Sequence, residues 1–127
     1  MKNPEEIGHL EDLLNSFSEA ERSRALAELD ARSQAGMIPQ PEMHDAVNGH
    51  AHSFYSYNAY GFSPSALAWL AKKHGYSMMG IVDFDTLDGV DEFLAACERL
   101  GVRGIAEMET RVFIPAFKAI EINSPGE

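Results

Sequence analysis

The chain has 127 residues, of which 45% are hydrophobic and 24% charged, as is ordinary for a globular domain. Its formal net charge of −10 argues against nucleic acid or a membrane surface as partner, because both attract clustered Lys and Arg. An internal disulfide is excluded by the single cysteine, Cys97, and the absence of any long apolar run or secretory signal favours the cytoplasm.

Helical patterns occupy the N-terminal third of the chain. Apolar residues recur at helical spacing over residues 3–17, after an Asn-Pro pair that is typical of a helix start. Ser18 and Glu21 have the spacing of a capping box, which predicts a second helix. Its charged residues, Arg22 among them, are expected on a solvated face. Residues 1–41 are therefore predicted to be a helical extension used for packing or dimerisation.

Beyond Pro41 the pattern changes to alternating strands and helices. The expected order is a strand at 45–49, a helix at 63–74, a strand at 77–83, a helix at 90–100 and a strand within 102–112. Strands joined in this way through short connections pair in parallel with right-handed crossovers. The fold class is therefore predicted to be α/β.

The first strand leads into His50-Ala51-His52. Side chains of an extended segment alternate between its two faces, so the two imidazoles are expected to point the same way. Neutral imidazole nitrogens are suitable ligands for Zn, Fe or Mn. Two histidines at this spacing are nevertheless a weak signal alone, because such pairs are often simply polar loop residues.

Acidic residues follow the other two predicted strands. Asp83 and Asp85 come at the end of the second strand, and Glu109 lies near the end of the third. The carboxyl ends of parallel strands share one edge, where active sites of α/β folds form. Together with the two histidines, these residues predict a binuclear hydrolytic centre of nitrogen and carboxylate ligands. The alternative for Asp85 is a cap of the next helix, and for Glu107 a solvated edge position.

Three segments resemble motifs of the polymerase and histidinol phosphatase (PHP) superfamily. Asn48-Gly49-His50-Ala51-His52-Ser53 resembles the first motif, residues 80–86 the second, and residues 107–112 the acidic third; the resemblance covers roughly residues 46–127. It implies a distorted (β/α)7 barrel, similar to a TIM barrel, with divalent metals at its C-terminal rim. It also implies a hydrolase of the phosphoesterase type, acting on a small phosphorylated substrate.

The resemblance also implies roles for individual residues. His50 and His52 match the paired histidine ligands, Asp83 the aspartate of the second motif, and Glu109 the bridging glutamate. These four residues are expected to bind Zn, Mn or Fe, with Mg as a further alternative, and Asp83 and Glu109 to be catalytic by holding the cations. Phe84 stands where the family usually has a histidine, so one ligand is absent.

The length of the chain is a further departure from the family. A complete barrel needs about 200 residues, whereas the residues after Pro41 suffice for three strands. Residues 42–127 are therefore expected to be the N-terminal part of a PHP-like barrel, with little turnover from this chain alone. Three parallel strands leave unpaired edges, which predicts a homodimer.

Two alternatives remain open from the sequence. Asp83-Phe84-Asp85-Thr86 is similar to the haloacid-dehalogenase phosphatase motif, in which the first aspartate is a nucleophile. Thr86 comes one residue too early for that motif, and that fold would not explain His50 and His52. The other alternative is a non-catalytic metal-binding or assembly module with a degenerate site, which the absent histidine favours.

Overall fold

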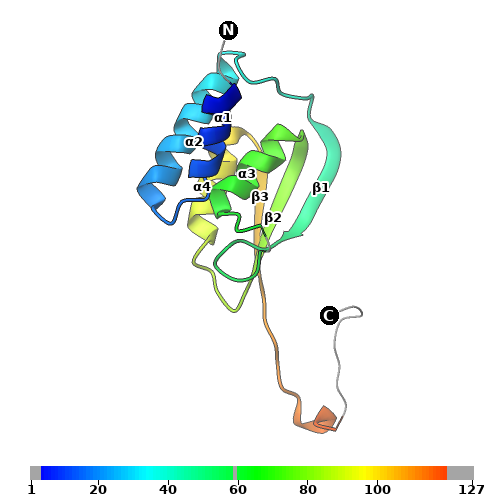
Figure 1. Cartoon of the computed structure of the whole chain (residues 1–127). Coiled ribbons are helices and arrows are strands. Elements are labelled where there is room, and N and C mark those ends of the chain that lie inside the picture. The colour runs from blue at the N-terminus through cyan, green and yellow to red at the C-terminus, as the bar shows by residue number, and fades with distance from the viewer. Residues whose placement is uncertain (1–3, 59, 120–127) are drawn as a thin grey trace.

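The computed structural model describes residues 4–58 and 60–119. Within them the chain forms three parallel strands and four α-helices (Figure 1). The order is α1 (Pro4–Leu13), α2 (Glu19–Gln34), β1 (His44–Ala51), α3 (Pro64–Lys73), β2 (Tyr76–Phe84), α4 (Val90–Leu100) and β3 (Arg103–Glu109), then a 3-10 turn at Pro115–Phe117. The predicted α/β class is confirmed. Within these residues, every helix is too short or too polar to cross a membrane.

The sheet has the order β1-β2-β3, with β2 in the centre. Strands β2 and β3 pair in continuous register, from Met78 opposite Arg103 to Phe84 opposite Glu109. The pairing of β1 with β2 is irregular between Asn48 and Ala51, where three steps along β1 match two along β2. This is the signature of a β-bulge. This irregularity therefore includes His50, the first of the paired histidines.

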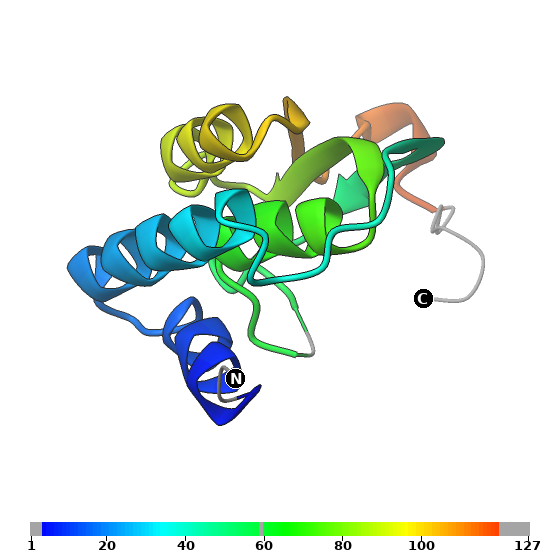
Figure 2. The same cartoon turned by 90° about the horizontal axis from the view of Figure 1, so that it is seen from above.

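Helices α3 and α4 cover one face of the sheet, and α1 and α2 lie on their far side (Figures 1 and 2). The core between these layers includes Trp69 of α3, Ile81 of β2 and Phe93 of α4, all buried. Gly104 of β3 lets α4 approach closely, because a Cβ atom there would lie 3.1 Å from the Cβ atom of Cys97. The described helices therefore all lie on one side of the sheet.

Arg22 of α2 is buried, with 2% of its surface exposed, so the prediction of a solvated position is wrong. Its Nε donates to Oε1 of Glu92 in α4 at 2.8 Å, and its Nη1 donates to the carbonyl of Ser16 at 2.8 Å. The hydrogen bond with Glu92 raises the pKa of Arg22 above its ordinary value. Arg22 and Glu92 are 70 residues apart in the sequence, so no local sequence pattern predicts that they pair. The pair attaches the N-terminal helices to the β/α units.

The segment after β3 leaves the body of the molecule. Residues 110–119 extend away from the sheet and all are exposed (Figure 1). Val112 and Phe113 each have 75% of their surface exposed. This segment therefore presents large apolar side chains without cover from the described part of the chain.

Candidate metal centre

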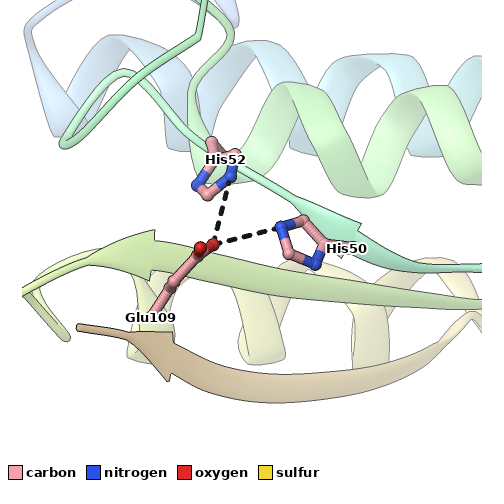
Figure 3. A group of neighbouring side chains, drawn as sticks. All are labelled: His50, His52 and Glu109. Atoms are coloured by element: carbon pink, nitrogen blue, oxygen red, sulfur yellow. Dashed lines mark ion pairs between the residues drawn. The ribbon is translucent and has the colours of Figure 1, made fainter. Parts of the chain in front are cut away.

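His50, His52 and Glu109 converge at one edge of the sheet (Figure 3). Oε2 of Glu109 lies 3.2 Å from Nε2 of His50 and 3.7 Å from Nε2 of His52. One possible ligand atom from each residue lies within 4.8 Å of the others. Two imidazole nitrogens and one carboxylate oxygen therefore surround a common point.

The strands position these three residues. Ala51 packs against the core under the helices, so the flanking His50 and His52 project to the opposite face, as alternation along a strand requires. Glu109 is the last residue of β3 and pairs with Phe84 of β2. The parallel order of the strands brings the ends of β1 and β3 to the same edge, and the side chain of Glu109 spans the end of β2 (Figure 3).

Two polar atoms of this group are buried without a hydrogen-bond partner among the described residues. They are Oε2 of Glu109 and Nδ1 of His52. Nε2 of His50 lies near Glu109 but without the alignment of a hydrogen bond. A buried carboxylate oxygen that lacks a partner is unfavourable, and a cation between it and the two imidazole nitrogens would compensate it. The donor set therefore fits a divalent metal ion.

Asp83 lies outside this group. It has 3% of its surface exposed, and it accepts three hydrogen bonds at 2.7 Å: from the backbone N–H and the hydroxyl of Ser53, and from the hydroxyl of Ser56. Both of its oxygens are therefore engaged by the loop that follows His52. The nucleophilic role of the dehalogenase alternative finds no support in this placement.

Ser53 and Ser56 were not singled out from the sequence. The available signal was two small hydroxyl residues, one directly after His52 and one four residues after it, which is also common in ordinary loops. Only the fold shows that both hydroxyls reach the same buried carboxylate on β2. Their partner lies about thirty residues away, as the separations of 27 and 30 show.

The neighbours of Asp83 also touch the group. The ring of Phe84 stacks on the imidazole of His52. The backbone N–H of Asp85 donates to the carbonyl of Glu109 at 2.8 Å, and the Thr110 hydroxyl donates to the Asp85 carboxylate. Asp85 has φ 56°, a left-handed conformation that aspartate tolerates better than most residues. Asp85 is therefore tied to the end of β3 and is outside the group of three.

Glu107 and Arg111, which lie either side of Glu109 on the sequence, are exposed. Glu107 pairs with Val82, two residues before the end of β3, and it is not among the three residues whose ligand atoms converge. No protein-family model, curated protein or solved structure matches the chain. The chemistry of the site is therefore inferred from its own residues.

Proposed function

We propose that His50, His52 and Glu109 bind a divalent metal ion and that the chain is part of a metal-dependent phosphoesterase of the PHP type. The observation that carries this proposal is the convergence of both imidazoles on Oε2 of Glu109, an oxygen that is buried without a hydrogen-bond partner among the described residues. The first and third motif-like segments supply these residues, in the order that the family resemblance implies.

The ligand set determines which ions suit the site. Two imidazole nitrogens with one carboxylate favour Zn, Mn or Fe over Mg, which prefers oxygen ligands and retains several waters. When bound, such an ion supplies Lewis-acid polarisation of a phosphoryl oxygen and lowers the pKa of water. His50 and His52 contribute neutral ligands, and Glu109 contributes the negative charge that holds the cation. We therefore propose Zn, Mn or Fe as the cofactor.

The architecture is compatible with this assignment. Parallel β/α units with helices on one face are the repeating unit of a (β/α) barrel, and we propose that residues 42–127 form part of such a barrel with residues 1–41 as its helical extension. The substrate in this proposal is a small phosphorylated molecule in the cytoplasm. The overall negative charge of the chain makes the bound cation the main attraction for a phosphoryl group.

A second candidate function is metal binding without catalysis. It is favoured by the small ligand group, which contains three residues, and by Phe84, a side chain that cannot ligate a metal. In this case the ion would stabilise the end of the sheet or an assembly. The two functions predict the same metal binding but differ in hydrolysis, so both must be measured.

Zinc binding is tested first, by calorimetry and by metal analysis of the purified chain. We expect the His50→Ala, His52→Ala double variant to lose the bound zinc, whereas His9→Ala, which alters an exposed histidine of α1, should retain it. Because protons compete for the imidazole nitrogens, the affinity should also fall as the pH is lowered. Equal zinc binding by the double variant and the parent would overturn the metal site.

Hydrolysis of bis(p-nitrophenyl) phosphate is then compared in the zinc- or manganese-loaded proteins. A phosphoesterase should show slow metal-dependent release of nitrophenol that Glu109→Gln abolishes, because this change removes the charge that holds the cation. If the parent binds metal but hydrolyses no faster than the double histidine variant, the non-catalytic function replaces the enzyme. Glu98→Gln, an exposed change on α4, is the matched control.

A further inference from the structure

We infer that Asp83 is a positioning residue that orients His52 toward Glu109 by holding the loop directly after it. This inference rests on the proposed metal site. The loop begins at Ser53, the residue next to His52, and Ser53 is fully buried. Both its backbone N–H and its hydroxyl donate to Asp83, at 2.7 Å each. The direction in which the chain leaves His52 is therefore set by one carboxylate.

A second contact extends this control further along the loop. The hydroxyl of Ser56 donates to Oδ1 of Asp83 at 2.7 Å, and the Ser53 hydroxyl also accepts from the backbone N–H of Tyr55 at 3.2 Å. Hydrogen bonds to an ionised acceptor are about twice as strong as neutral ones. Three of them on one buried carboxylate make a turn that is tied to β2 at both ends.

The anchor lies in the central strand of the sheet, which is paired on both sides. Asp83 lies in the central strand and pairs with Met108 of β3, whereas His52 follows the end of β1, an edge strand whose residues are mostly exposed. The last pair of β1 and β2 joins Ala51 to Ile81. Beyond this pair the strand ladder no longer holds His52, so the hydrogen bonds to Asp83 replace it.

Phe84 completes the constraint from the other face. Successive side chains of a strand point to opposite faces, so Asp83 holds the backbone on the helix-covered side while the Phe84 ring packs on the imidazole of His52. A metal ligand must be held within about 0.5 Å of its productive position. The end of β2 therefore sets both the backbone and the ring of His52 without contributing a ligand.

The experiment measures zinc affinity and the visible spectrum of the cobalt-substituted protein for Ser56→Ala, Ser53→Ala and Asp83→Asn. Loss of a residue that orients a ligand typically weakens metal binding by about 10–100-fold, and we expect this loss together with a changed cobalt spectrum. Ser56 is only partly buried, so Ser56→Ala should fold, and Ser56→Thr, which keeps the hydroxyl, should restore both readouts.

Ser65→Ala is the matched control. Its hydroxyl is also buried and donates to a carboxylate, that of Glu92, at 2.8 Å, but it lies in α3, away from the three ligand atoms. We expect it to lower the melting temperature as the loop variants do, while zinc affinity and cobalt spectrum stay unchanged. A purely structural role for Asp83 would instead give the same metal binding in all of these variants.

The remaining outcomes separate this inference from the proposed function. If the parent binds no metal, both fail. If the parent binds zinc through its histidines but Ser56→Ala and Asp83→Asn keep its affinity and spectrum, only the positioning role is overturned. If Asp83→Asn abolishes binding while Ser53→Ala and Ser56→Ala leave it intact, Asp83 is itself a ligand and the inference is wrong.

Discussion

Phe84 lies flat against the imidazole of His52, with ring centroids 4.5 Å apart and ring planes inclined by 9°. The PHP resemblance leads one to expect a histidine ligand at this position. The chain has instead an apolar ring that packs on His52, a proposed ligand directly after β1. This substitution is compatible with a site of three protein ligands, His50, His52 and Glu109.

A histidine introduced at this position should strengthen the proposed metal site. Phe84→His places a third imidazole within stacking distance of His52, and we expect zinc affinity to rise at least about tenfold, the effect of ~1.4 kcal/mol of additional binding free energy. Calorimetry measures the change. Phe84→Leu is the control, because it keeps an apolar side chain without a ligand or an aromatic ring. Its affinity should fall below that of the parent, and a rise in this variant would contradict the supporting role of the ring.

The buried pair of Arg22 and Glu92 should dominate the attachment of the N-terminal helices. Arg22→Met leaves the Glu92 carboxylate largely buried with Ser65 as its remaining donor, and such uncompensated burial costs about 3–5 kcal/mol. Urea unfolding should show this loss. The double variant Arg22→Met, Glu92→Leu removes both charges and should recover most of it. Equal stability of Arg22→Met and the parent would show that the helices do not depend on the pair.

Stability at alkaline pH should depend on Cys97. Burial raises the pKa of its thiol from 9.0 to about 12. The folded state therefore keeps the thiol protonated while the unfolded chain ionises, so the stabilisation is fully present below pH 9 and is lost as the pH rises toward 12. Melting temperatures between pH 8 and 11 measure this. Cys97→Ala, although less stable overall, should lose less stability over the same range, and parallel curves for the two proteins would refute the assignment.

A second copy of the chain is the partner that we propose for its exposed surfaces. Strand β1 is an edge of the sheet with mostly exposed residues, and Val112 and Phe113 are each 75% exposed on the segment after β3. Unpaired strand edges and apolar side chains of this kind favour association. Sedimentation at low micromolar concentration should give a dimer, and Phe113→Ser should shift it toward monomer. A monomeric parent protein would rule out this dimer.

The local pattern of the sequence predicted the type and order of the helices and strands, although α1 ends at Leu13 and not at Phe17, which is exposed. Ser18 accepts a hydrogen bond from the backbone N–H three residues later, as its capping-box spacing predicts. Ser63 does the same at the start of α3, and Gly101 takes the left-handed conformation that ends α4. These signals act within a few residues, so they can be recognised without the fold. The alternation of His50 and His52 around Ala51 is local in the same sense.

The composition of the site depended on tertiary structure. The sequence put Asp83 and Glu109 at the same edge, but it contained no information on which face of each strand the helices would cover. Once α3 and α4 pack on the sheet, Asp83 lies on the covered side with Ser53 and Ser56, and Glu109 lies on the other side with the histidines. Arg22 was misjudged for the same physical reason, because burial of a charge is decided by a partner that is distant in sequence, here Glu92.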